Sequence, residues 1–155
     1  MNMQVREQVD LWLKTLSATS GKVFRLNEKG IFASTDESGQ AFVVEVPDAS
    51  DQVYFCAPIA TVPEDNKAAC LERLLQWNLY GLRTQYCTLG LEENTNRIIM
   101  HYSMEVAYLE CQTFINVFNN FIERVRKIKQ DWEQFLRDLS TGGSTALPDI
   151  NMLRI

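Results

Sequence analysis

The spacing of hydrophobic residues along the chain changes repeatedly between the helical period of about three to four and the two-residue alternation of a strand. Segments rich in Gly, Pro, Asn, Asp and Ser separate these runs and favour tight turns. The predicted elements are, in order, a helix at 4–17, strands at 31–35, 41–46 and 52–58, a helix from 63 to about 80, strands at 84–91 and 97–104, and a helix at 108–139. This order predicts an α+β fold, α-β-β-β-α-β-β-α, with helices packed on a twisted antiparallel sheet.

The segment from Cys70 to Met104 combines a helix, a glycine and a hairpin in quick succession. The apolar positions of the helix end at Gly81, which can supply the left-handed residue that terminates a helix. Two strand-like runs follow, joined by the polar turn 92–96. These residues offer surfaces for packing and pairing, and they contain no pattern typical of a catalytic site.

The last predicted helix carries a heptad seam, because its apolar residues are spaced alternately by four and three. The seam consists of Phe114, Phe118, Phe121, Val125, Ile128, Trp132, Phe135 and Leu139. At about 1.5 Å per residue this helix would be about 45 Å long. Two arrangements fit the seam: the second half projects or packs on another subunit, or the whole helix lies across the sheet of its own domain.

The composition predicts one globular domain, because 155 residues with 46% hydrophobic content can bury a core. The domain is expected at 1–139, with a flexible tail at 140–155. A net charge of −5 argues against a general nucleic-acid binder. The first residues lack the apolar run of a signal peptide and no stretch is long enough to span a membrane, so a cytoplasmic protein is expected. The four cysteines form no CxxC pair and are expected to be reduced thiols.

No motif for phosphate binding or for a hydrolase nucleophile occurs, so the sequence predicts no enzyme, no cofactor and no metal. The single histidine, His101, has no companion ligands at metal-binding spacing. A small enzyme that uses a cysteine with His101 remains a remote alternative, because such partners meet in space and not in sequence. The basic run 124–129 of the last helix is interpreted as a solvated helical face.

Apolar residues lie on both faces of the predicted strands. Phe42, Val44 and Val46 share one face of their strand, while Val43 lies on the other. A sheet covered by helices on one side should have a polar outer face. The surplus favours a partner-binding surface, and the alternative is that helices cover both faces.

The order of elements resembles that of the class I type III secretion chaperones, a Tir-chaperone-like family. The local sequence is similar as well: VYFCAPIATVPEDN resembles the third strand leading into the second helix, LERLLQWNLYG resembles that helix with its aliphatic–Asn–aliphatic–Gly ending, and TLGLEENTNRIIMHYSM resembles the hairpin. The resemblance covers residues 4–138 and leaves out the tail.

The resemblance implies a cytoplasmic homodimer of a Gram-negative bacterium, without nucleic acid or cofactor. It would bind the N-terminal segment of a secreted effector in extended form and keep it soluble and competent for secretion. A secretion ATPase or a regulatory protein is a further implied partner. The alternative within the family is a regulatory chaperone that sequesters an anti-activator and couples secretion to transcription.

Mapping the family onto this chain gives two sets of candidate residues. The effector-binding candidates are Trp12, Leu16, Phe32, Val43 and Phe55. The candidates for the dimer interface are Cys70, Leu74, Trp77 and Gly81.

Overall fold

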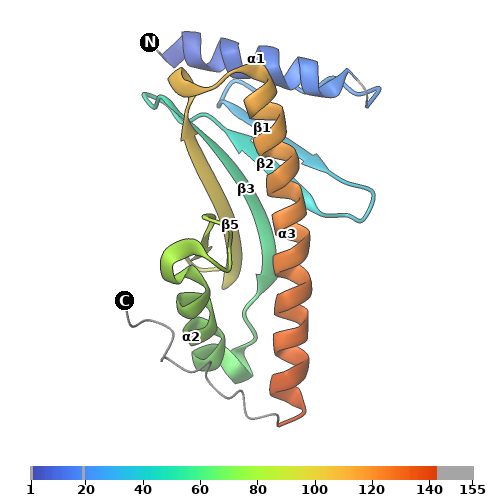
Figure 1. The fold of residues 1–155 in the computed structure, drawn as a ribbon, viewed down its shortest axis with the longest axis vertical. Helices are drawn as coiled ribbons and strands as arrows, with labels where there is room; N and C mark the ends of the chain where they lie inside the picture. Colours follow the sequence, from blue (N-terminus) through green and yellow to red (C-terminus); the bar gives the residue numbers. More distant parts are fainter. Residues whose placement is uncertain (1, 19, 143–155) are drawn as a thin grey trace.

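The computed structural model describes residues 2–18 and 20–142, so the predicted tail lies outside the described residues except for its first three positions. The elements are α1 (Asn2–Ser17), β1 (Ile31–Thr35), β2 (Ala41–Glu45), β3 (Gln52–Thr61), η1 (Glu64–Asn66), α2 (Lys67–Asn78), η2 (Leu79–Gly81), β4 (Thr88–Leu91), β5 (Arg97–Glu105), η3 (Val106–Tyr108) and α3 (Cys111–Ser140) (Figure 1). None of the helices in the described ranges is long and apolar enough to cross a membrane.

The strands form one antiparallel sheet with the order β1-β2-β3-β5-β4, so β1 and β4 are its edges. The long helix α3 runs along the sheet, and α1 lies across the end at which α3 begins (Figure 1). This arrangement confirms the predicted α+β fold and the predicted order of elements.

The core lies between α3 and one face of the sheet. Along β3, residues that point toward α3 are buried and their neighbours are half-buried, as the two-residue period requires. Phe55 sits at the centre, with ring centroids 5.5 to 6.2 Å from those of Phe114, Phe118 and Phe121. Trp12 of α1 closes the end of this cluster against Phe114.

The other face of the sheet is only partly shielded. Val43, Tyr54, Cys56 and Pro58 point to that side and are all half-buried, whereas their neighbours along the strands are buried. Within the described ranges the helices therefore close off one face of the sheet and leave the second accessible. The alternative of a sheet covered on both faces is wrong for this part of the chain.

The seam of α3 is buried along nearly its whole length, from Phe114 to Phe135. Its first half packs on the sheet, and its second half packs on α2, where the Trp132 and Trp77 rings meet edge to face at 6.1 Å. Arg73 of α2 lies 4.6 Å over the ring of Phe135. The helix therefore stays on its own protomer and does not project, although α2 rather than the sheet covers its second half.

Three predicted boundaries are wrong for local reasons. β3 continues through Pro58 to Thr61, because a shift of register between Pro58 and Ala60 accommodates a residue without an N–H group. β4 begins at Thr88 and not at 84, because Gln85 and Tyr86 have positive φ angles that a strand excludes. α3 begins at Cys111 because the preceding residues form the turn η3.

Arg6 ties α1 to the turn before β1. Its guanidinium donates to the carbonyl oxygens of Val46, Glu28 and Lys29 at 3.0 to 3.4 Å and pairs with Asp48 at 2.7 Å. Gly30 lies beneath this guanidinium with φ +76°. The close approach of the Arg6 side chain therefore depends on the absence of a side chain at position 30.

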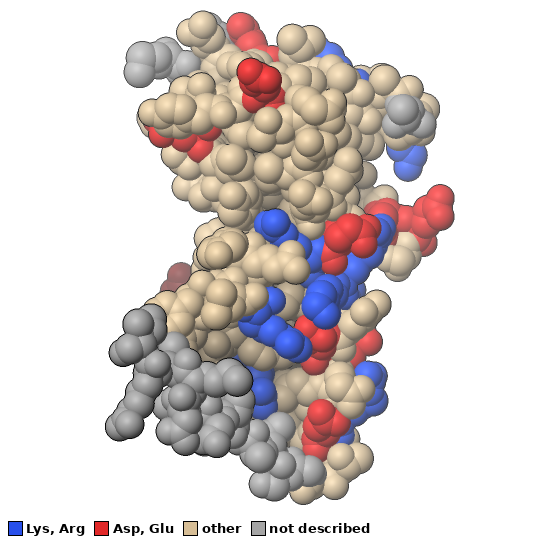
Figure 2. Space-filling model, viewed as in Figure 1, with Lys and Arg blue, Asp and Glu red and all other residues tan. Residues whose placement is uncertain are grey.

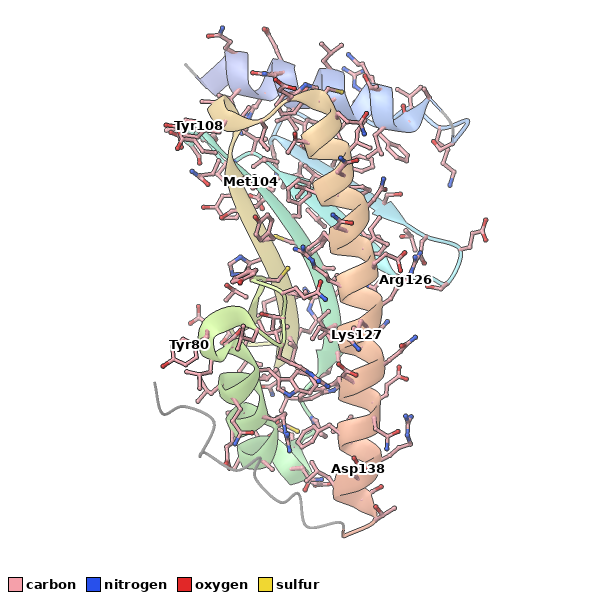
Figure 3. All side chains as sticks on the ribbon, in the orientation of Figure 1. Tyr80, Met104, Tyr108, Arg126, Lys127 and Asp138 are labelled. Carbon is pink, nitrogen blue, oxygen red and sulfur yellow. The ribbon has the colours of Figure 1, made fainter. Side chains whose placement is uncertain are left out.

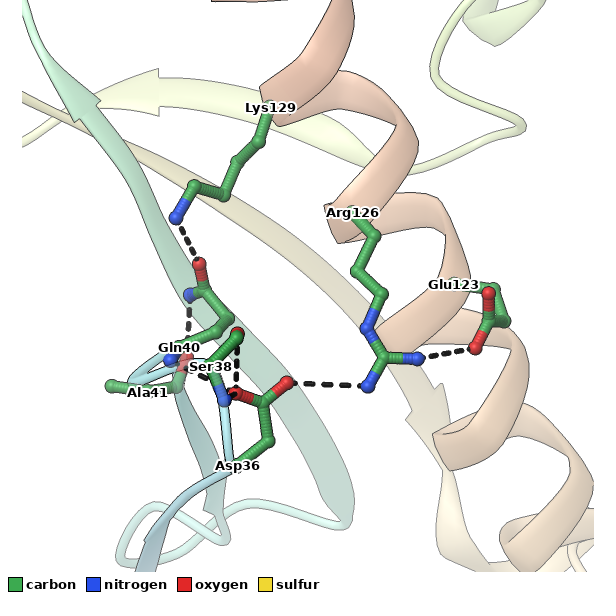
Figure 4. A network of polar contacts seen from close by, with 7 residues as sticks. All are labelled: Asp36, Ser38, Gln40, Ala41, Glu123, Arg126 and Lys129. Carbon is green, nitrogen blue, oxygen red and sulfur yellow. Dashed lines mark hydrogen bonds and ion pairs between the residues drawn. The ribbon is translucent and has the colours of Figure 1, made fainter.

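The tip of the β1–β2 hairpin is held on α3 by a polar network (Figure 4). Gln40 is buried and donates to the carbonyl oxygen of Pro58 at 2.9 Å, while its own Oε1 accepts from Lys129 at 2.7 Å. Asp36 pairs with Arg126 at 3.2 Å. The basic run of α3 is therefore not a uniformly solvated face, because two of its cations contact the hairpin.

The charge of Asp36 should make the hairpin sensitive to acid. Hydrogen bonds, first from the Ser38 hydroxyl and then from Gln40 and Arg126, lower the pKa of Asp36 to about 2. A lowered folded-state pKa stabilises the fold above the unfolded value of about 3.9 and loses this effect as pH falls toward 2. Asp36→Asn should therefore lower the melting temperature at pH 7, and the gap from wild type should narrow between pH 4 and pH 2. An equal gap at every pH would contradict this role.

Candidate interaction surfaces

Three of the five predicted effector-binding residues are part of the core. Trp12 and Phe55 are brought together around Phe114, and Phe32 is buried beside Phe24, with the two rings 4.7 Å apart. Leu16 and Val43, the other two candidates, are half-buried. The spacing of apolar residues indicates which side chains share a face of a helix or strand, but it does not indicate which of these faces another helix covers. Leu16 and Val43 are therefore the accessible members of this set.

The predicted dimer-interface residues lie on the buried flank of α2, where Trp77 packs on α3, and in the turn η2. Cys70, Leu74 and Trp77 are buried within the protomer, and Gly81 is half-buried. The Trp77 ring meets the Trp132 ring edge to face, and the Arg83 guanidinium is 5.6 Å from its centroid. These side chains could meet a second subunit only if α2 left its place against α3.

A second apolar stripe of the same region is exposed. Here we call it the α2–β4 patch, and its side chains are between 43% and 74% exposed. The patch consists of Leu75, Leu79, Tyr80, Leu82, Tyr86 and Leu91. Leu75, Leu79 and Leu82 follow the spacing of four and three, which is the signal in the sequence that could have identified this stripe. Contiguous exposed apolar side chains of this kind usually mark a site of protein contact.

The turn from η2 to β4 gives the patch its shape. Tyr80 and Gly81 both have positive φ angles of 57° and 66°, and the Tyr86 N–H donates to the Gly81 carbonyl oxygen at 2.8 Å. A Cβ atom on Gly81 would lie 3.1 Å from Cα of Tyr86, so glycine allows both the backbone conformation and the close approach. Tyr80 consequently points away from α3 (Figure 3). The helix therefore ends at Asn78, earlier than the stop predicted at Gly81, although Gly81 has the left-handed conformation that the sequence predicts for it.

Asn78 covers the β4 edge of the sheet at Leu89. Its Nδ2 donates to the Leu89 carbonyl oxygen and its Oδ1 accepts from the Leu89 N–H, both at 2.8 Å. The side chain therefore occupies the two backbone groups that β4 turns away from β5 at this position. This contact explains physically why an asparagine stands in the aliphatic–Asn–aliphatic–Gly ending of the helix.

Replacing Asn78 should loosen the β4 edge. Asn78→Ala leaves two half-buried backbone groups of Leu89 without their partners, and the free energy of unfolding should fall by about 1–3 kcal/mol. Asn78→Asp keeps the acceptor but loses the donor, so its effect on amide exchange at Leu89 should be smaller. Urea unfolding and hydrogen exchange measure both effects. Unchanged protection of the Leu89 amide in Asn78→Ala would contradict the assignment.

The β1 edge remains open over most of its length. Val46 donates to the Gly30 carbonyl oxygen and Asp36 to that of Gln40, so the even-numbered residues of β1 face β2 and the odd-numbered ones face outward. Asn27 occupies both outward groups of Ile31. No strand in the described ranges pairs with the outward groups at Ala33 and Thr35.

The pair formed by Cys56 and His101 is poorly suited to nucleophilic catalysis. Cys56 and His101 are register partners on the accessible face, and Thr88 is the partner of His101 on β4. Burial, and then the charge of Glu45, raise the pKa of the Cys56 thiol to about 11, so it stays protonated at neutral pH and is a poor nucleophile. Within the described ranges no three His, Cys, Asp or Glu side chains are placed to hold a metal ion.

The family model of the Tir chaperone protein (CesT) family matches residues 12–129. The chain belongs to this family, which is a chaperone family, and the resemblance inferred from the sequence is confirmed. No curated protein sequence matches the chain.

Solved structures share the fold at low sequence identity. A chain of the ExsC–ExsE complex superimposes with a TM-score of 0.67 at 14% identity, covering 83% of this chain and 93% of that one. A chain of the HopA1–SchA chaperone–effector complex gives 0.67 at 13%, covering 84% and 97%. A chain of the heterodimeric ExoU–SpcU complex from the Pseudomonas aeruginosa type III secretion system gives 0.58 at 16%, covering 79% and 93%.

Proposed function

We propose that this protein is a type III secretion chaperone that binds the N-terminal segment of a secreted effector in extended form and keeps it soluble and competent for secretion. It acts as a homodimer in the cytoplasm of a Gram-negative bacterium, and it has no catalytic function. The family and the fold support this proposal, since the chaperone–effector complex of HopA1 and SchA contains the same architecture.

The open edge of β1 is the observation that carries the proposal. An extended polypeptide can add to such an edge, where main-chain hydrogen bonds supply affinity and alternate side chains supply selectivity. The outward groups of Ala33 and Thr35 are available for pairing, while at the opposite edge Asn78 already occupies the outward groups of Leu89. Val43, on the neighbouring strand β2, is accessible to side chains of the added segment.

The homodimer would use the α2–β4 patch rather than the buried flank of α2. The patch is apolar, exposed and carried by one helix, one turn and one edge strand, which a two-fold axis could bring against their own copies. The main-chain pairing of the effector would then lie on β1, at the opposite edge of the sheet from β4. This division keeps the two surfaces separate, so they can be tested independently.

Affinity capture from the source cell, grown under secretion-inducing conditions, tests the proposal. The tagged protein should recover a secreted protein, and truncations should place the contact within the first ~100 residues of that protein. Recovery of a non-secreted regulatory protein instead would favour the alternative in which the chaperone sequesters an anti-activator. Recovery of neither would contradict the proposal.

A proline at the β1 edge sharpens this test. Ala33→Pro removes an N–H that points away from β2, so the β1–β2 pairing keeps its hydrogen bonds while the outer edge loses a donor. Client binding should weaken while the dimer persists. Ala33→Val is the matched control, because it keeps the N–H group. Equal client binding by both variants would place the client elsewhere.

A further inference from the structure

A polar cleft opens between α3 and the turn that leads from η2 to β4. Its volume is about 490 Å³, which is within the usual range of ligand sites. The lining side chains are those of Gln85, Asn120, Glu123, Arg124 and Lys127. On the face seen in Figure 2, Lys and Arg side chains gather across the middle of the molecule, with Asp and Glu side chains among them. We refer to this cavity as the Arg124 cleft.

The Arg124 guanidinium is held there by neutral acceptors. Its Nε donates to Oε1 of Gln85 at 3.1 Å, and Nη1 contacts Sγ of Cys87 at 3.9 Å. Burial raises the pKa of Cys87, so this sulfur stays a thiol and does not neutralise the cation. In the described part of the chain no carboxylate pairs with Arg124, and its position is fixed before any ligand arrives.

The acidic side chains near the cleft are engaged by cations other than Arg124. Lys127 lies 4.0 Å from Oδ2 of Asp131, and the same oxygen is already paired with Arg83 at 2.9 Å. Glu123 also lines the cleft, and its carboxylate is paired with Arg126, which contacts Asp36 of the β1–β2 hairpin. Arg83 and Lys127 therefore share the Asp131 carboxylate and Arg124 pairs with none within the described ranges, in a chain whose net charge is −5.

We propose that the Arg124 cleft binds an aspartate or glutamate side chain of the polypeptide that this chaperone holds. A guanidinium and an ammonium converging on one cavity match a carboxylate, and hydrogen bonds between charged groups are stronger than neutral ones. Arg124 is half-buried and already ordered, so little further ordering opposes binding. The inference rests on the proposed chaperone function and adds a charge requirement to its client.

A peptide probe tests the site without a known client. The probe is a fluorescein-labelled octapeptide of alternating Glu and Ser, and the control peptide carries Gln in place of Glu. Fluorescence anisotropy at 50 and 200 mM salt should show binding of the Glu peptide that weakens with salt. The double variant R124Q/K127Q should bind about tenfold more weakly or worse. K22Q/K29Q changes the net charge equally at exposed positions away from the cleft, and should bind within about twofold of wild type.

Three results would overturn the inference. The first is that the Glu peptide does not bind the wild type, and the second is that K22Q/K29Q loses as much affinity as R124Q/K127Q. The third is that R124Q/K127Q changes the dissociation of the dimer but not the binding of the peptide, which would assign the cleft to the subunit contact. The single variant K127Q preserves the contacts of Arg124 and should stay fully folded, so its expected partial loss of about threefold separates binding from unfolding.

Failure of the chaperone function would look different. In that case the Glu peptide would bind through the cleft, but affinity capture would recover no secreted protein. If a secreted client is recovered and binds R124Q/K127Q as tightly as wild type, the charge requirement is wrong while the chaperone function stands.

Discussion

Leu79→Glu is expected to convert the dimer into a folded, soluble monomer. Leu79 lies in the α2–β4 patch and is 57% exposed in the protomer, so a glutamate there remains hydrated while the subunit is alone. In a two-fold contact the carboxylate would be buried twice, and burial of an unpaired charge costs several kcal/mol. The dissociation constant should rise by about a hundredfold or more, as measured by sedimentation equilibrium.

Two controls make this result specific. Val23→Glu also places a carboxylate at an exposed apolar position, but outside the patch, and the dimer should persist. Trp77→Ala tests the buried flank of α2 instead of the exposed patch. It removes a buried ring next to Trp132, so it should lower the free energy of unfolding of the protomer by about 3–5 kcal/mol. A dimeric Leu79→Glu protein would show that the patch is not the contact, and a monomeric wild type would reject the homodimer itself.

Gly30→Ala is expected to destabilise the fold severely. A Cβ atom at this position would lie 2.4 Å from the Val46 carbonyl oxygen and 2.6 Å from two nitrogens of Arg6. The Arg6 side chain would have to leave, and with it the hydrogen bonds that tie α1 to the turn before β1. The overpacking and the backbone strain at φ +76° together should lower the free energy of unfolding by about 3–5 kcal/mol. Urea denaturation measures this loss.

Gly39→Ala is the matched control for this substitution. Gly39 also has a positive φ, of +84°, but a Cβ atom there meets nothing within 4 Å. Only the backbone strain should therefore appear, about 1–2 kcal/mol. Similar losses in both variants would show that the packing of Arg6 over Gly30 contributes little.

The site illustrates what periodicity can and cannot predict. α2 and the turn after it carry two apolar stripes of equal spacing, one with Cys70, Leu74 and Trp77 and the other with Leu75 and Leu79. Either could face α3, and the family resemblance implies that the first is the subunit contact. The structure buries that stripe under Trp132 and leaves the second exposed, because a partner 55 residues away along the chain decides which stripe is covered.

The basic run of α3 shows the same division. The sequence places Arg124, Arg126, Lys127 and Lys129 on one helix and predicts a solvated face. In the structure Arg126 and Lys129 hold the β1–β2 hairpin, while Arg124 and Lys127 line the cleft on the side of the η2–β4 turn. Helical spacing separates these pairs, but only the positions of the hairpin and the turn give each pair its role.

The order of the elements, the buried seam of α3, the left-handed conformation of Gly81 and the chaperone family can all be predicted from the amino-acid sequence. These features are recorded in the spacing of near neighbours and in local residue types, so they can be read without a partner. The exposed stripe of α2, the open parts of the sheet edges and the place where unpaired positive charge collects could not be predicted in this way. Those features depend on contacts between segments far apart in the chain, whose geometry no local pattern specifies.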